Sequence, residues 1–245
     1  MKKQILTLIF LSLVGLKLVA QDTERTFILL NESKVADIDI YKKNYPAIRN
    51  WWLKASPATY NRSAHTSETG RTYSMVFIKG DKNFGEYIGN RGELTTKIGV
   101  ELKDLVAQST ANQTQATTRS SWVQVKNISV IEPDFKLENY DFRKVVLFTV
   151  PFDKVNEYES LIEKANAEDK ALGLKYNYIV YRAIDGYANN TYLLILPDKS
   201  RLDYYTHQDE RNAKRKGNAI LTETNKKASQ LRNTIRLDHL SRVMN

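Results

Sequence analysis

Two arginines, one histidine and two tyrosines are the side chains of this sequence whose type and spacing best suit chemistry. Arg62 and Arg182 lie 120 residues apart at matching positions of two predicted strands. Tyr60 and His65 flank the first arginine, and Tyr181 precedes the second. A guanidinium that faces an enclosed space must meet a carboxylate or an anionic ligand, because an unpaired buried charge is too costly. We therefore predict that these five residues bind a small anionic or apolar molecule. The alternative is that both arginines keep their heads in water at a sheet edge.

Three histidines, His65, His207 and His239, could ligate a cofactor. A haem iron needs one imidazole facing an apolar cavity, which His65 or His207 would supply. The alternative for each is a surface or hydrogen-bonded histidine. No two histidines have the i, i+4 spacing of a helical metal site, and the sequence contains no cysteine. We therefore predict no metal site and no cofactor, with haem as the alternative.

Several classes of enzyme lack their characteristic pattern in this sequence. It has no GxSxG elbow of serine hydrolases, no phosphate-binding glycine loop and no dinucleotide-binding glycine pattern. Without cysteine, disulfides, thiolate metal sites and cysteine nucleophiles are excluded. Carboxylates such as Glu157, Glu159, Glu163, Asp198 and Asp203 fall on predicted helix surfaces or turns, so we assign no acid–base pair.

Aromatic side chains gather near the space that the candidate residues would enclose. The set comprises Trp51, Trp52, Tyr60, Tyr176, Tyr178 and Tyr181. Large aromatics with polar tips can line a ligand pocket. They more often only fill the space between sheets, and both interpretations stay open here.

The first twenty residues have the three parts of a secretory signal peptide. Lys2 and Lys3 give a positive start, residues 5–14 are apolar, and Ala20 closes a cleavage site before Gln21. The apolar stretch is too short to cross a bilayer, which takes about 20 apolar residues. We predict that residues 1–20 are removed and that the chain is exported to the periplasm or the extracellular space, with no membrane-spanning segment.

Positive charge dominates the sequence, and much of its excess is local. The whole sequence carries a net charge of +9, and without the three lysines of the first twenty residues 34 basic residues face 28 acidic ones. The excess collects at residues 211–216 and at Lys226 and Lys227. We expect a solvated helix face there, with binding of envelope polyanions through residues 211–227 as the alternative. Nucleic-acid binding is not expected, because it needs more than this stretch and because export is predicted.

The chain after residue 20 contains one pattern twice. The matched apolar runs are residues 26–30 with 144–150, and residues 72–78 with 191–196. All matched positions are offset by 117 to 120 residues and keep their order. We infer an internal duplication, with a first domain at 21–138 and a second at 139–245.

Hydrophobic periodicity predicts the elements of each copy. In the second copy we expect strands at 144–150, 176–184, 192–196 and 234–243, and helices at 155–172 and 200–232, the latter broken near Gly217. In the first copy we expect a helix to about residue 55 that Pro46 kinks or divides, strands at 58–65 and 71–78, and a helix at 84–106. Residues 108–121 should be a polar loop or a frayed helix end, and residues 122–131 a closing strand.

Each copy is thus expected to be a βαββαβ unit, the ferredoxin-like arrangement with both helices on one face of a four-stranded antiparallel sheet. The other sheet face stays apolar and uncovered, so one copy alone would be poorly stable. Two copies can bury these faces against each other. We predict an α+β fold of tandem ferredoxin-like repeats packed sheet-to-sheet as an intramolecular α/β barrel.

In order and pattern the chain resembles the dimeric α/β-barrel superfamily, with two domains fused in one chain. The resemblance covers residues 25–245 and is most specific at 145–150, 154–158, 181–182 and 191–197, which are similar to the antibiotic-biosynthesis-monooxygenase-like branch. It implies relatives that include cofactor-free monooxygenases, haem-degrading and haem-dependent enzymes, isomerases and members without activity. The resemblance therefore implies a fold but no single function.

Three functions remain open at this stage. The favoured one is an exported, non-catalytic α/β-barrel protein that binds a small apolar or anionic molecule or acts as an interaction module. The second is a cofactor-free or haem-linked monooxygenase-type enzyme, as the resemblance allows. The third is a polyanion-binding module of the cell envelope. The oligomeric state stays open.

Overall fold

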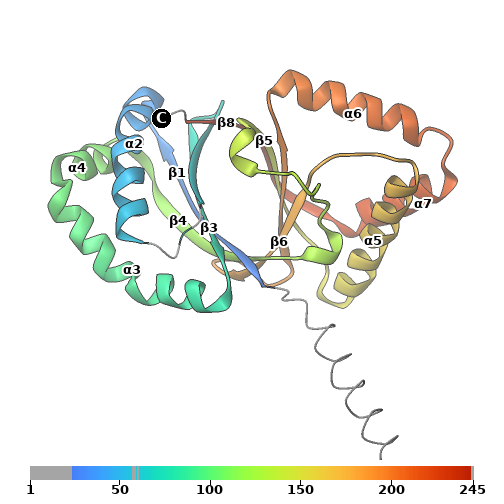
Figure 1. Ribbon diagram of the computed structural model, residues 1–245, viewed down its shortest axis with the longest axis horizontal. Coiled ribbons are helices and arrows are strands. Elements are labelled where there is room, and N and C mark those ends of the chain that lie inside the picture. Colours follow the sequence, from blue (N-terminus) through green and yellow to red (C-terminus); the bar gives the residue numbers. More distant parts are fainter. Residues whose placement is uncertain (1–23, 57–58, 60, 244–245) are drawn as a thin grey trace, which may run out of the picture.

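The computed structural model describes residues 24–243 apart from residues 57, 58 and 60, and it contains the predicted order of elements twice (Figure 1). The predicted signal peptide at 1–20 and Tyr60 lie outside the described residues. The first unit comprises β1 (Thr26–Val35), α2 (Ile38–Ala55), β2 (Asn61–Ser67), β3 (Arg71–Lys79), α3 (Asp81–Glu101), α4 (Lys103–Ala111) and β4 (Gln113–Gln124). The second comprises β5 (Phe142–Thr149), α5 (Val155–Ala171), β6 (Ile179–Asp185), β7 (Thr191–Asp198), α6 (Arg201–Arg215), α7 (Ala219–Leu231) and β8 (Asn233–Arg242).

Hydrogen bonds join the strands into one closed barrel in the order β1-β3-β2-β8-β5-β7-β6-β4. Within each unit the order is that of a ferredoxin-like sheet, and all pairs are antiparallel. Two seams join the units: β2 pairs with β8 at His65↔Arg242, and β4 pairs with β6 at Val123↔Arg182. Closure leaves no sheet edge unpaired. The predicted fold of two ferredoxin-like repeats in one α/β barrel is confirmed, and the sheets are hydrogen-bonded as well as packed.

Alternation along the strands divides apolar side chains between the barrel interior and the helices outside. On β3, Tyr73, Met75 and Phe77 face the interior, whereas Val76 and Ile78 pack toward α2 and α3. Strands with both faces covered carry continuous apolar runs rather than an apolar–polar alternation. This explains the two pairs of apolar runs from which the repeat was recognised.

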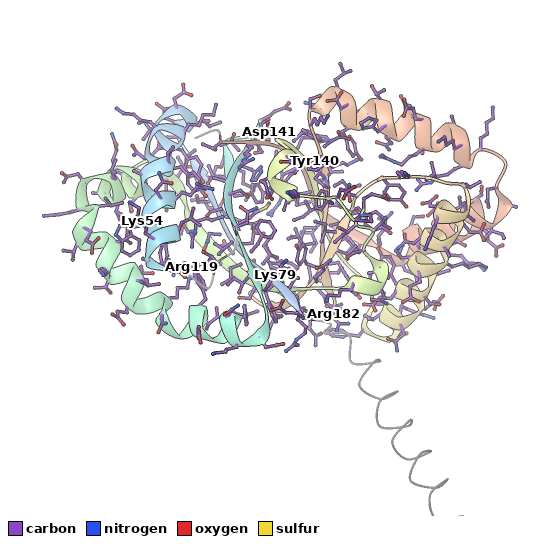
Figure 2. All side chains as sticks on the ribbon, in the orientation of Figure 1. Lys54, Lys79, Arg119, Tyr140, Asp141 and Arg182 are labelled. Atoms are coloured by element: carbon purple, nitrogen blue, oxygen red, sulfur yellow. The ribbon has the colours of Figure 1, made fainter. Side chains whose placement is uncertain are left out.

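The barrel interior is a packed core, and side chains crowd it in Figure 2. Its largest side chains are almost fully buried and come from both units: Trp122, Tyr73, Phe77 and Met75 from the first, Arg143 and Tyr181 from the second. The space between the sheets is therefore filled mainly by aromatic and aliphatic groups, and of the aromatic set named from the sequence Tyr181 has this filling role.

The helices form two layers on opposite flanks of the barrel (Figure 1). In the second unit α7 packs against α5, whereas α6 contacts the strands β5 and β7. Gly217, with φ of +85°, lies in the turn between α6 and α7, so the predicted break is confirmed. Among the described residues, no helix combines the length and the apolar character needed to cross a bilayer.

The structure corrects the prediction for the polar stretch 108–121. Instead of a loop, these residues complete α4 and form most of β4. The first half of β4 pairs with the end of β1, where most of its side chains are exposed, so no apolar alternation marks the strand. Strand β4 ends at Gln124, and the predicted strand over 122–131 is too long.

Three smaller predictions also change. The helix predicted at 84–106 is two helices, α3 and α4, separated at Leu102 by a non-helical φ of −119°. Helix α2 continues through Pro46 as one helix. Strand β6 begins at Ile179, so residues 176–178 precede it, and only Tyr178 forms a bridge, to Val130.

The turn between β6 and β7 supports the β4–β6 seam, and we expect Gly186→Ala to open it. Gly186 has φ of +83°, and a Cβ there would lie 2.6 Å from the carbonyl oxygen of Arg119 on β4. The substitution should lower the free energy of unfolding by about 3 kcal/mol, because left-handed strain and a backbone clash add. Urea unfolding of the chain from residue 21 measures this.

Gly173→Ala is the matched control. Gly173 has φ of +66°, but a Cβ there would meet nothing within 4 Å. Only the conformational strain remains, so we expect a loss of about 1 kcal/mol. Equal losses in the two variants would contradict the proposed contact between the turn and β4.

Candidate ligand-binding cleft

A cleft of about 570 Å³ lies on the helix side of the second unit. Its floor is the outer face of the sheet, with Phe148 on β5, Val180 on β6, and Leu194 and Leu196 on β7. Helices α5 and α6 form its walls, and we call it the α5–α6 cleft. Tyr140, labelled in Figure 2, lines it from the segment that connects the two units. This volume falls within the roughly 300–1,000 Å³ common for small-molecule sites.

The cleft exists because the helices differ in how they meet the sheet. Helix α5 turns Tyr158, Ile162 and Ala165 toward the strands at helical spacing. Helix α6 is rich in charged residues, and Tyr204 is its one buried residue. Without an apolar stripe α6 has little to bury against α5, and α7 packs there instead.

Two tyrosines and two arginines form one wall of the cleft. The rings of Tyr176 and Tyr178 stack with centroids 5.6 Å apart and planes at 13°. The guanidinium groups of Arg211 and Arg215 lie 5.3 and 5.7 Å from the Tyr176 ring centroid. Cations over an aromatic face are attracted by its quadrupole, so this wall joins aromatic surface to positive charge.

Asp169 anchors that wall from α5. Its buried carboxylate accepts two bonds from Arg215, one from Nε at 2.7 Å and one from Nη2, and a third from the Tyr176 hydroxyl at 2.5 Å. Burial and the bond to Asp169 raise the pKa of Tyr176, so its phenol stays protonated at neutral pH. Arg215 is therefore neutralised within the protein.

Arg211 has no such partner. It is half-buried and contacts the Tyr176 ring. The charge of Asp198 acts on it, but it makes no hydrogen bond or ion pair with the described residues. Burial lowers the pKa of Arg211, yet a guanidinium remains charged at neutral pH. Six cationic and three acidic side chains line the cleft: Lys175, Lys199, Arg211, Lys214, Arg215 and Arg232 against Asp169, Asp198 and Glu210. The cleft thus carries a positive excess with one unpaired guanidinium.

His207 also lines the cleft, and Asp198 orients it. Its Nδ1 lies 2.9 Å from Oδ2 of Asp198, a buried residue at the end of β7. A carboxylate on one ring nitrogen fixes the imidazole and leaves Nε2 for a ligand or a proton. Asp198 was expected to be a solvated turn residue, which is wrong because it is buried against His207.

The corresponding space in the first unit is occupied by side chains. The Arg62 guanidinium lies 4.7 Å from the Trp52 ring centroid and donates from Nη2 to the Tyr87 hydroxyl at 2.9 Å. A hollow of about 250 Å³ remains beside Tyr87. The larger cleft therefore belongs to the second unit.

The residues predicted from the sequence lie on two different faces of the sheet. Arg62 and Arg182 face the helices. The half-exposed Arg182, labelled in Figure 2, forms an ion pair with Glu159 at 3.5 Å. His65 and Tyr181 are buried and face the barrel interior, and Tyr60 lies outside the described residues. The structure does not bring these residues together, and none of the four described ones lines the α5–α6 cleft.

Strand register also separates the two arginines. Arg62 lies opposite Val76, the sixth residue of β3, whereas Arg182 lies opposite Tyr192, the second residue of β7. They share a face of the sheet but not a position along it. The two units repeat the same helices and strands in the same order. The prediction that Arg62 and Arg182 occupy equivalent positions, 120 residues apart, was wrong.

Asp169 is the cleft residue that the sequence analysis missed. It continues the stripe of Tyr158, Ile162 and Ala165 at helical spacing, so a carboxylate lies at the C-terminal end of the buried face of α5. A buried acid needs a cationic partner, and the basic stretch at 211–216 was the larger of the two local excesses of positive charge in that half of the chain. A carboxylate on an apolar helix stripe, together with this basic stretch, was the sequence pattern that could have predicted the pairing of Asp169.

Solved structures share this fold, whereas no family model and no curated protein sequence matches the chain. A "putative monooxygenase" from Lactobacillus acidophilus NCFM has a TM-score of 0.60 at 11% identity, over 90% of this chain and 95% of that one. An anthrone oxidase-like protein has a TM-score of 0.56 at 11% identity, over 92% and 93%. A heme-binding protein from Thermus thermophilus has a TM-score of 0.51 at 6% identity, over 89% and 91%. The chain has the dimeric α/β-barrel fold of these proteins, and at such identities the likeness shows the fold alone.

Asp169→Ala tests the anchor of the cleft wall. Removing one partner of a buried ion pair leaves the other uncompensated, so we expect a loss of about 3 kcal/mol in the free energy of unfolding. Glu163→Gln, on the exposed side of the same helix, keeps an oxygen that can accept the bond from Asn127, so it should leave stability unchanged. Urea unfolding of both variants decides, and a stable Asp169→Ala chain would show that Arg215 needs no carboxylate.

The burial of the His65 imidazole determines how the free energy of unfolding should depend on pH. Burial, with the charges of Arg143 and Arg242, lowers the pKa of His65 well below 6.5. The unfolded chain takes up a proton there while the folded chain does not, so stability falls as the pH drops below about 6.5. At about pH 5.5 this costs the wild type about 1.4 kcal/mol relative to neutral pH, and His65→Leu should lack that loss.

The measurement is urea unfolding of wild type and variant at both pH values. His239→Gln, which replaces a histidine that is far less buried, should retain most of the wild-type dependence. The same pH dependence in wild type and His65→Leu would contradict a neutral, buried imidazole.

Proposed function

We propose that this protein is an exported α/β-barrel protein that binds one planar, anionic small molecule in the α5–α6 cleft. The observation that carries the proposal is the unpaired guanidinium of Arg211, half-buried beside a stacked pair of tyrosines. A partly buried charge without a partner is costly, and an anionic group of a ligand would remove that cost.

The shape of the ligand follows from the walls. Phe148, Tyr158, Tyr176 and Tyr178 present aromatic surface, and Leu194 adds to an apolar floor. Pockets of this kind hold the body of a ligand by apolar contact and orient it by a few polar groups. Two such groups are buried and unpartnered among the described residues, Nδ2 of Asn166 and Oε1 of Gln208.

Haem is one molecule of this class, because it is planar and carries two carboxylates. The residues fit it: the imidazole of His207, oriented by Asp198, would hold the iron, and Arg211 would pair with a carboxylate. Bound haem would supply one-electron and oxygen chemistry. The name of the Thermus thermophilus protein supports including haem among the ligands tested.

A monooxygenase-type enzyme is the second candidate. The pair of His207 and Asp198 favours it, because an imidazole held by a carboxylate can take a proton from a bound substrate. The names of the structural neighbours point the same way. Binding without turnover remains our first proposal, since Arg211 and the aromatic walls require only a ligand.

Binding of envelope polyanions is less well supported. Arg211 and Arg215, the first and fifth residues of the basic stretch, turn toward the cleft and Tyr176. Lys227 pairs with Glu223 at 2.7 Å. The exposed charge of this stretch is therefore smaller than the sequence suggests.

Export remains part of the proposal and rests on the first twenty residues, which lie outside the described structure. Cell fractionation followed by N-terminal sequencing tests it. We expect envelope or culture fractions to contain a chain that starts at Gln21. A cytoplasmic chain that retains Met1 or starts at Lys2 would contradict export without touching the ligand site.

The ligand is tested first by native mass spectrometry of the chain purified from its own envelope under mild conditions, where a stoichiometric extra mass is expected. Affinity is then measured with two probes, hemin and the aromatic anion 1-anilinonaphthalene-8-sulfonate. Arg211→Met should weaken both about tenfold or more, because a charge-assisted contact contributes about 1.5–3 kcal/mol.

Arg182→Met is the matched control, because that arginine lies on the same sheet face but outside the cleft. It should leave both affinities unchanged. A hemin spectrum that changes in His207→Ala would identify haem, whereas binding of the sulfonate alone would indicate a metal-free ligand. Equal binding by Arg211→Met and wild type would contradict the proposal.

A further inference from the structure

Arg143, at the start of β5, is a guanidinium fully enclosed by the barrel. Its exposed fraction is 0%, and its Nη1 contacts the Ser63 hydroxyl at 3.3 Å and the Met75 sulfur at 3.1 Å. Its group also lies 5.8 Å from the Phe77 ring centroid. Nε and Nη2 have no partner among the described residues. None of these contacts is with a carboxylate.

No carboxylate of the described residues forms an ion pair with Arg143. Burial lowers its pKa to about 9, so the group is still a cation at neutral pH. The buried acids Glu32 and Asp238 are both paired with Arg236. The charge of Asp141 acts on Arg143, but Asp141 is half-exposed and forms its ion pair with Arg242 at 3.6 Å. An unpaired guanidinium in a dry core is too costly to be left without an anion.

His65 adds a second unpartnered group to the same place. Its exposed fraction is 0%, and neither ring nitrogen has a partner among the described residues. It lies two residues after Ser63 on β2, so both side chains point the same way, toward Arg143. On the intervening strand β8, His65 lies opposite Arg242 and Arg143 lies opposite Leu240, so the two side chains start two residues apart along the same strand.

We propose that Arg143, His65 and Ser63 bind a single buried halide ion, chloride in the native protein, inside the barrel. All three can donate to an anion: two free guanidinium nitrogens, one imidazole N–H and a hydroxyl. Trp122, Tyr73, Phe77 and other large side chains fill the interior, so an anion bound there must be monatomic rather than a metabolite. The ion joins β2 of the first unit to β5 of the second across β8.

This site is separate from the α5–α6 cleft, because it lies on the other face of the sheet. The halide proposal is therefore tested independently of the ligand proposed for the α5–α6 cleft. The role of the halide is structural: it supplies the counterion that the sequence does not provide, and it binds the folded chain but not the unfolded one.

Bromide tests the site directly. Crystals of the chain from residue 21 grown in sodium bromide should show an anomalous peak within hydrogen-bond reach of Arg143 and Ser63. In solution, the urea midpoint of the wild type should rise with bromide concentration relative to sodium gluconate at equal ionic strength, since gluconate is too large to enter. Arg143→Met should lose this dependence.

Two further variants keep the test decisive. Arg182→Met, which removes a guanidinium outside the barrel, should keep the full bromide dependence. Ser63→Ala should weaken the dependence of the urea midpoint on bromide several-fold. This variant provides the test if Arg143→Met does not fold. A water at the site in place of the peak, equal wild-type midpoints in the two salts, or a crystal peak without a solution effect would each overturn the proposal. The last result would mean binding at crystal concentration only.

Discussion

The two seams between the repeats are the interactions on which the rest of the structure depends. Each repeat alone would be an open four-stranded sheet with one apolar face and two free edges. Pairing β2 with β8 and β4 with β6 removes the edges and encloses the apolar faces together. Polar links cross the same boundary, because Arg236 of the second unit bonds Glu32 of the first and the Tyr73 hydroxyl donates to Asp238.

Closure also determines where a ligand can bind. Packed side chains fill the interior. The enclosed surfaces that remain for a small-molecule ligand are the outer faces of the sheet, under the helices. In the first unit Trp52, Tyr87 and Arg62 occupy that surface. In the second unit the polar helix α6 cannot pack on α5, and the space stays open over a floor that the barrel holds rigid. The positive charge of α6 then gives this space its preference for anions.

The fold could be predicted from sequence because its cause is repeated apolar patterning, which needs no side-chain detail. Strand β4 escaped prediction because most of its first half is exposed, so burial leaves no pattern to find. The site escaped for a different reason: whether Arg182 or Tyr181 faces the helices depends on strand register, and a shift of one residue exchanges the two faces. Asp169 lies between Glu168 and Lys170, and Arg143 precedes Lys144, so charged neighbours conceal in the sequence that these two side chains are buried.

Fusing the two repeats frees them from the symmetry that a dimer of identical chains must obey. In a homodimer any substitution that opens a pocket in one half opens it in the other, and both halves carry the resulting loss of packing. Here Trp52 and Arg62 can keep one half filled while α6 diverges in the other. Sequence drift should accordingly differ between the halves, with the first constrained as a scaffold and the second shaped by whatever molecule it receives.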